Sequence, residues 1–122
     1  MTPKFRAYDG GSLSRMYQPD EVMVGNGDIW IIDEDSVAGD WIVNNDLHLM
    51  QSTGLKDKNG KEIFEGDVVK CNGLLGTIKS LKAMWICSFV KYNNYQKVGF
   101  FAQEIEVVGN IYENPELLED KK

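Results

Sequence analysis

The 122-residue sequence has few of the residues that catalysis and metal binding require. It contains one histidine, His48, and two cysteines, Cys71 and Cys87, which form no CxxC pair. Structural zinc sites use four such ligands and thiol redox motifs use a CxxC pair, so both cysteines are predicted to be small, buried or half-buried strand residues. His48 alternates with Leu47 and Leu49. We therefore expect it on a strand surface, without a role in acid–base chemistry.

Long apolar runs are also absent. No stretch approaches the roughly 20 apolar residues that cross a bilayer, and residues 1–10 lack the apolar region of a signal peptide. We therefore expect a cytoplasmic chain with no membrane partner.

Charge of one sign is missing from two stretches. Residues 16–53 contain no Lys or Arg, and residues 68–103 contain no Asp or Glu. The first stretch carries Asp20, Glu21, Asp28, Asp33, Glu34, Asp35, Asp40 and Asp46, and the second carries Lys70, Lys79, Lys82, Lys91 and Lys97. The net charge of -6 argues against a general nucleic-acid-binding protein. The separation of signs favours association between complementary surfaces.

The aromatic and glycine content is high, with three Trp, five Tyr, five Phe and twelve Gly, and favours a chain rich in strands and turns. Alternating or continuous apolar segments predict strands at residues 5–8, 21–24, 29–32 and 41–43. Residues 29–32 are apolar at every position, so we expect this strand to be covered on both faces.

The segment 53–70 combines two turns with the start of a strand. Asp57-Lys58-Asn59-Gly60 is typical of a turn closed by an Asx side chain. Glu65-Gly66-Asp67 predicts a second turn with Gly66 at positive φ, before a β-branched strand. Further strands are expected at residues 67–71, 76–81, 84–92, 96–101 and 107–111, and a short helical turn at 114–118. This order is typical of a small SH3-like barrel, here residues 62–108.

Two other polar segments carry no site. Asp33, Glu34 and Asp35 are consecutive and lack the spacing of a calcium loop, and residues 54–58 lack the spacing of a phosphate-binding loop. No catalytic, cofactor-binding or metal-binding residue is predicted, and no cofactor.

The lysines of residues 68–103 are interleaved with aromatic residues. These are Trp85, Phe89, Tyr92, Tyr95, Phe100 and Phe101. Such a mixture can bind single-stranded nucleic acid by stacking and charge, but a small barrel also needs aromatic residues for its core. We therefore keep nucleic-acid binding as an alternative and prefer solvated lysines over a packed barrel.

Three blocks resemble the YopX-like family of phage and prophage proteins. They are KFRAYD at residues 4–9, residues 49–51 with TGLKDKNGKEIFEGDVV at 53–69, and VGNIYENPELL at 108–118. The blocks fall near the start, middle and end, so the resemblance spans the chain. It implies an SH3-like barrel in the C-terminal part and a phage context in the cytoplasm of a host cell. The family has no assigned catalytic residues, so none is carried over.

Together these observations predict a mainly β, single-domain protein. Residues 1–52 form an N-terminal β-rich segment that packs on an SH3-like barrel, and residues 53–122 contain that barrel and a C-terminal helical turn. The predicted role is a non-enzymatic phage or prophage accessory protein that acts through protein–protein contacts, as a homo-oligomer. The alternative is a nucleic-acid-binding accessory protein that uses the lysine and aromatic residues.

Overall fold

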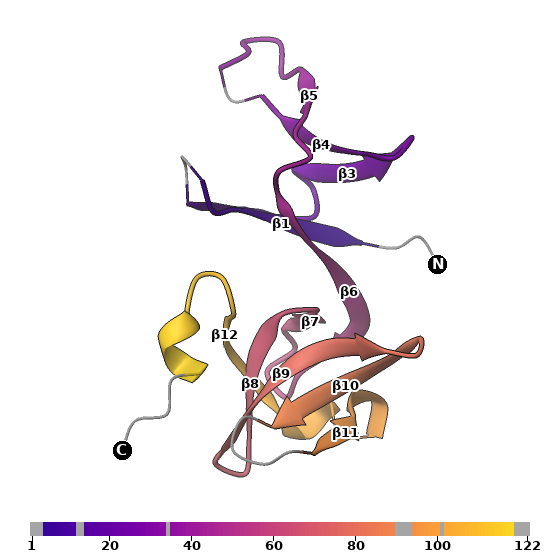
Figure 1. Cartoon of the computed structure of the whole chain (residues 1–122), viewed down its shortest axis with the longest axis vertical. Helices are drawn as coiled ribbons and strands as arrows, with labels where there is room; N and C mark the ends of the chain where they lie inside the picture. The colour runs from indigo at the N-terminus through magenta and orange to yellow at the C-terminus, as the bar shows by residue number, and fades with distance from the viewer. Residues whose placement is uncertain (1–3, 12–13, 34, 90–93, 101, 119–122) are drawn as a thin grey trace. The chain divides into compact units, whose positions relative to one another are not determined.

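Strands and tight turns make up most of the chain, so the predicted mainly β fold is confirmed (Figure 1). The computed structural model describes residues 4–11, 14–33, 35–89, 94–100 and 102–118. Within these residues the chain forms two units, Met1–Gln51 and Ser52–Lys122.

The first unit is built on two antiparallel groups of strands. Strand β1 (Phe5–Asp9) pairs with β2 (Arg15–Tyr17) and with the first residues of β6 (His48–Lys56). Strands β3 (Val22–Gly25), β4 (Asp28–Ile32) and β5 (Trp41–Val43) form a three-stranded sheet in that order. Its core consists of Ala7, Tyr17, Val22, Ile31 and Leu47. The sequence did not predict β2, because residues 12–20 show no clear alternation.

The second unit is built on a five-stranded antiparallel sheet. Its strands are β8 (Asp67–Cys71), β9 (Leu74–Leu81), β10 (Met84–Phe89), β11 (Tyr95–Lys97) and β12 (Glu106–Asn110), in the order β11-β10-β9-β8-β12. The last part of β6 pairs with β7 (Glu62–Phe64). The sheet is curled into a half-barrel (Figure 1) around a core of Ile63, Val69, Ile78, Cys87, Val98, Ala102 and Ile105. A closed SH3-like barrel and its packing with the N-terminal segment stay predictions.

The predicted strand at residues 96–101 is wrong beyond Lys97. The chain forms two 3-10 helices there, η1 (Val98–Phe100) and η2 (Ala102–Glu104). Val98, Ala102 and Ile105 all enter the core. These residues are four and three positions apart, which is a helical spacing. The spacing is not visible within residues 96–101 alone, because Ala102 and Ile105 lie beyond that window. The last three residues of the predicted strand 84–92 lie outside the described residues, and the C-terminal helical turn is confirmed as η3 (Pro115–Leu118).

Candidate functional site

Asp57, the polar residue at the centre of the family-like block, serves the fold. Its side chain is 4% exposed, and one carboxylate oxygen accepts N–H groups of Asn59 and Lys61, each at 2.9 Å. The other oxygen accepts the Val107 N–H of β12, also at 2.9 Å. Burial acts to raise the pKa of Asp57, but these hydrogen bonds and the charge of Lys61 together lower it. The predicted Asx turn is confirmed, and both oxygens of the carboxylate accept backbone N–H groups.

The second turn of this block is also structural. Gly66 has φ of 87°, as predicted, and it joins two elements, since its N–H donates to Ile78 O and its carbonyl accepts from Ile111 N–H. The neighbouring Asp67 is fully buried and accepts the Phe64 N–H at 2.8 Å. A third buried polar residue, Asn110, accepts two N–H groups of the C-terminal turn. Asp57, Asp67 and Asn110 therefore stabilise the loops of this block and of the C-terminal turn.

An open groove of about 840 Å³ runs along the first turn of the block. It is lined by Gly54, Leu55, Lys56, Asp57, Lys58, Gly60, Gly99, Ala102, Gln103 and Glu104. Asp57 is its only buried carboxylate, and all three of its acceptor bonds go to the backbone. The groove therefore offers no group poised for acid–base chemistry.

The remaining candidates from the sequence are not brought together. His48 lies exposed on β6, and Asp35 is exposed in the β4–β5 loop while Glu34 is outside the described residues. Among the residues that the structure describes, no three His, Cys, Asp or Glu side chains gather as a metal site would need. The described helices are all too short and polar to span a bilayer.

The two cysteines are a buried and a half-buried thiol, as predicted. Cys87 belongs to the core of the second unit, and Cys71 packs against that core. Burial, with a smaller effect of Cys71, raises the pKa of Cys87 to about 11. Cys87 is therefore a poor nucleophile at neutral pH.

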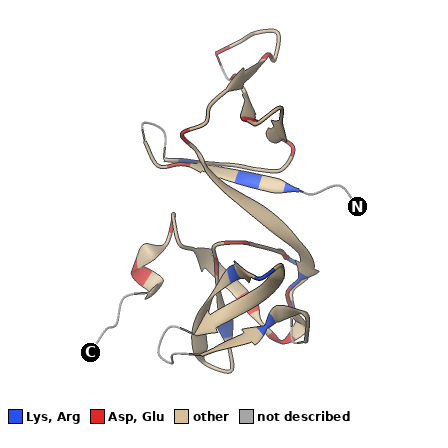
Figure 2. Ribbon diagram, turned by 45° about the vertical axis from the view of Figure 1, so that its right-hand side comes forward, with Lys and Arg blue, Asp and Glu red and all other residues tan. Residues whose placement is uncertain are grey.

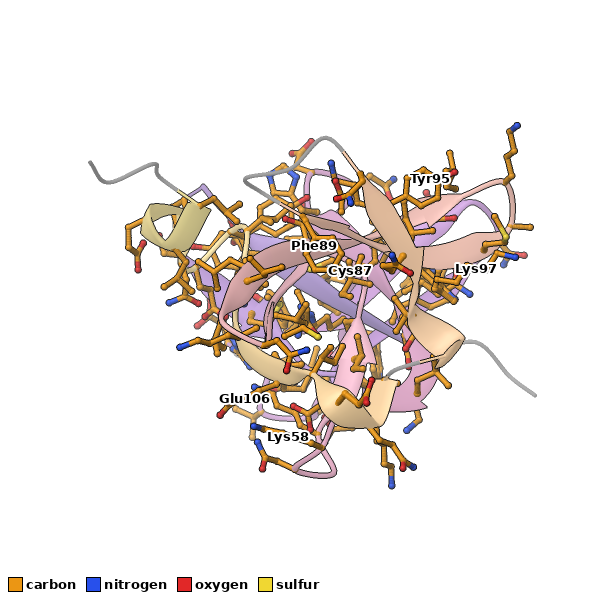
Figure 3. All side chains as sticks on the ribbon, turned by 90° about the horizontal axis from the view of Figure 1, so that it is seen from below. Lys58, Cys87, Phe89, Tyr95, Lys97 and Glu106 are labelled. Atoms are coloured by element: carbon orange, nitrogen blue, oxygen red, sulfur yellow. The ribbon has the colours of Figure 1, made fainter. Side chains whose placement is uncertain are left out.

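Two exposed lysines of the second unit, Lys79 and Lys97, lie on one face of the five-stranded sheet. Lys79 on β9 and Lys97 on β11 both pair with Ile86 of β10, so all three side chains lie in one row on one face. In the next row Tyr95, 51% exposed, pairs with Ser88. We call Lys79, Ile86, Ser88, Tyr95 and Lys97 the lysine face; Figure 3 shows Tyr95 and Lys97 on β11.

Two of the six residues of the proposed aromatic platform lie on the core side of β10 instead of on the lysine face. Trp85 and Phe89 alternate with Ile86 and Ser88 and pack against the core with Cys87 (Figure 3). Tyr92, Phe101, Lys91 and the side chain of Phe100 lie outside the described residues. Tyr95 is thus the aromatic residue that the described structure places beside the lysines.

The outer face of the three-stranded sheet carries apolar residues on all three strands, with Asp28 at the start of β4 on the same side. Register and alternation place Met23, Trp30 and Val43 in one row and Ile32 and Trp41 in the next. These five residues form the apolar face. The opposite face of β4 packs into the core, where Ile31 is 3% exposed. Met23 and Val43 are 48% and 43% exposed, and the other three are half-buried.

The apolar face corrects one prediction and adds a site that the sequence did not show. Residues 29–32 were expected to be covered on both faces, but within the chain only Ile29 and Ile31 pack into the core. Because side chains alternate along a strand, the sequence of β4 is enough to place Trp30 and Ile32 on one face. The contributions of Met23, Trp41 and Val43 become visible only once the register of β3 and β5 is known.

Carboxylates surround the apolar face. Asp28 is the first residue of β4, Asp33 follows its last residue, and Asp40 precedes β5. Their hydrogen bonds are to neutral groups, such as Asn45 Nδ2 on Asp28 and Ser36 Oγ on Asp40. Figure 2 shows acidic residues in the loops of this unit and basic residues on strands of both units. The carboxylates beside the apolar face and the lysines of the lysine face thus differ in sign.

Comparison with known proteins gives matches to one family. The model of the YopX protein family matches residues 4–119. The crystal structure of protein EF1440 from Enterococcus faecalis is similar, with 28% identity and a TM-score of 0.67 over 98% of this chain and 99% of that one. Protein yopX from Bacillus subtilis is similar in fold, with 21% identity and a TM-score of 0.64 over 95% of this chain and 98% of that one. No functionally curated protein matches the chain. The match over nearly all residues shows that the chain belongs to the YopX protein family.

Proposed function

We propose that this protein is a non-enzymatic accessory protein of a phage or prophage that works through protein–protein contacts and forms a homo-oligomer in the host cytoplasm. The phage context rests on the resemblance of the three sequence blocks to the YopX-like family. The contact function rests on the surface of the first unit.

The apolar face carries this proposal. An antiparallel sheet with one face on a core normally exposes polar residues on the other. Here the five residues of the apolar face lie together, with Asp28 at the start of β4 as the charged residue on the same side, and two of the five are more than 40% exposed. Exposed, contiguous apolar surface rimmed by polar residues is typical of an interface, and interfaces are enriched in Trp and Met at their centre. The apolar face has this composition.

The rest of the described structure supports a binding role over an enzymatic one. The most buried carboxylates, Asp57 and Asp67, are engaged by backbone N–H groups. The buried thiol of Cys87 has a raised pKa. These groups are used in folding, which leaves surface contact as the function that the geometry favours.

The test places charge on the apolar face and measures the oligomeric state by light scattering after size-exclusion chromatography. Met23 and Val43 are the residues to change, because both are well exposed and Glu at these positions need not disturb the core. We expect the wild type to elute as an oligomer at micromolar concentration and the Met23→Glu/Val43→Glu variant as a monomer.

Val37 provides the matched control. It is an apolar residue in the β4–β5 loop, fully exposed and outside the apolar face. Val37→Glu adds one charge of the same sign to the same unit, half the change of the double variant, and should leave the oligomer unchanged. A wild type that is monomeric in low salt, or a Met23→Glu/Val43→Glu variant that assembles as well as Val37→Glu, would contradict the proposal.

A further inference from the structure

We propose that the apolar face of one copy docks on the lysine face of a second copy, in a head-to-tail contact. The inference deepens the proposed function and rests on it. The surface that covers the apolar face is, in this inference, the lysine face of another copy.

Charge disfavours a contact of the apolar face with itself. Asp28, Asp33 and Asp40 flank this face, and residues 16–53 contain no Lys or Arg that could neutralise them. A symmetric contact would place two acidic rims against each other. Like charges brought together at an interface are repulsive and act against that partner. The apolar face therefore fits a surface with cationic edges better than a second apolar face.

The lysine face has the complementary layout. Lys79 and Lys97 lie on strands either side of β10, about 10 Å apart by the usual strand spacing, with Ile86 between them. Within the described residues neither lysine has an ion-pair partner, and no Asp or Glu occurs between residues 68 and 103. Lys82 adds a further charge at the β9–β10 turn. Ile86 is only 5% exposed, so the lysine face presents Tyr95 as its exposed aromatic residue, beside the cationic edges.

Both faces are available to a second molecule. Met23, Val43 and Tyr95 are each more than 40% exposed, and Lys79 and Lys97 are exposed as well. In the contact, apolar burial supplies most of the free energy, and the charged rims set orientation and association rate. Raising the salt concentration should therefore slow assembly more than it dissolves the formed oligomer.

A contact between two different faces is heterologous, so each copy uses both faces and can bind two neighbours. It closes into a ring when the rotation between copies allows and continues as a filament otherwise. This property allows a complementation test that a symmetric contact would fail.

The test uses two double variants, each with one damaged face. Met23→Glu/Val43→Glu keeps the lysine face, and Lys79→Glu/Lys97→Glu keeps the apolar face. We expect each variant alone to be monomeric by sedimentation velocity. An equimolar mixture should form a heterodimer of two chains and nothing larger, because only one pair of intact faces remains. Lys56→Glu/Lys58→Glu, the same charge change at exposed lysines outside the lysine face, should assemble like the wild type.

The outcomes separate this inference from the proposed function. If the Met23/Val43 variant assembles like the wild type, the proposed function itself is wrong. If that variant is monomeric but the Lys79/Lys97 variant assembles normally, the proposed function stands and the head-to-tail contact is wrong. Both variants are also titrated with a labelled single-stranded oligonucleotide. Salt-dependent binding that is lost only in the Lys79/Lys97 variant, with assembly intact, would overturn the inference and identify the lysine face as a nucleic-acid site.

Discussion

The two sheets of this protein differ in where their polar groups lie. The five-stranded sheet of the second unit is surrounded by buried, hydrogen-bonded polar residues, namely Asp57, Asp67 and Asn110, and its outer face carries lysines. In the three-stranded sheet of the first unit the carboxylates are in exposed loops and turns, and the outer face is apolar.

This difference suggests separate roles for the two sheets. Buried polar residues with several backbone partners fix loop conformations within the chain, so the second sheet has its polar groups satisfied internally. The three-stranded sheet has a core on one face and apolar residues on its other face, which is the surface that we propose a partner covers. If the comparison is correct, removing a buried polar group of the second unit should lower the free energy of unfolding more than removing an exposed one of the first unit.

The largest effect is expected from Asp57→Ala. The variant leaves the N–H groups of Asn59, Lys61 and Val107 without their acceptor. Each buried donor left unsatisfied costs about 1–3 kcal/mol, less where water can reach it, so we expect a loss of about 3 kcal/mol. The matched change in the first unit is Asp28→Ala, which removes one exposed hydrogen bond from Asn45 and should cost less than about 0.5 kcal/mol. Urea denaturation measures both, and equal losses would contradict the comparison.

The stability that Asp57→Ala loses should depend on pH, and the lowered pKa of Asp57 gives the sign of that dependence. Because the pKa of Asp57 is lowered in the folded protein, its carboxylate contributes stability that is fully present above the unfolded-state pKa. This contribution is lost as the pH falls through the lowered folded-state pKa. The stability difference between wild type and Asp57→Ala should therefore be constant near neutral pH and shrink below about pH 4. A difference that grows on acidification would show that the carboxylate is not held in this way.

An intermediate effect is expected from Gly66→Val. Gly66 is buried with φ of 87°, where a β-branched residue is strained, and the expected loss is about 2 kcal/mol. Gly25→Val is the control in the first unit, because Gly25 is not at positive φ and an added Cβ meets no atom within 4 Å. Thermal melts followed by circular dichroism should show a clear loss for Gly66→Val and little change for Gly25→Val. Equal melting temperatures for wild type and Gly66→Val would show that the turn is built differently.

Local patterns predicted the elements that depend on neighbouring residues. Strands β1, β3, β4 and β5, the Asx turn at Asp57 and positive φ at Gly66 all follow from local sequence. The contact of Asp57 with Val107 joins residues 50 positions apart, and no local pattern indicates it. The 3-10 helices after Lys97 were missed because the helical spacing of Val98, Ala102 and Ile105 extends beyond the window 96–101 that was assigned to a strand.

The candidate site was predictable only in part, for a related reason. The sequence showed the apolar runs at 29–32 and 41–43 and the stretch that contains the lysines. Which of these residues share one side of a sheet depends on the register between strands, and the sequence does not show that register. Trp85 and Phe89 occur among the lysines in sequence, yet they alternate onto the core side of β10. Met23 is remote from Trp41 and Val43 in sequence, and β4 brings all three to one surface.

The smallest effect concerns hairpin turns of one type that occur in both sheets. Two residues at positive φ close β3–β4, β8–β9 and β9–β10. The first two turns are Asn26-Gly27 and Asn72-Gly73, the favoured pair for this conformation. The third is Lys82-Ala83, with φ of 49° and 64°. Two residues with a Cβ and no Asx side chain are strained there, so the five-stranded sheet contains one turn that is less favourable than its counterpart in the three-stranded sheet.

Replacing glycine by alanine in the first two turns should therefore lower the stability of the protein, and replacing alanine by glycine in the third should raise it. Gly27→Ala and Gly73→Ala should each cost about 1 kcal/mol, and by similar amounts, because φ is 80° and 81° and the added Cβ meets no atom within 4 Å at either position. Ala83→Gly should gain about 0.5–1 kcal/mol, since relief of strain exceeds the added entropy of the unfolded chain. The variant keeps Lys82, so the charge of the turn is unchanged, and urea denaturation of all three variants gives the comparison directly. If Ala83→Gly destabilises the protein, the two-residue turn is wrong. The register that places Lys79 opposite Ile86 would then be wrong as well, and with it the lysine face.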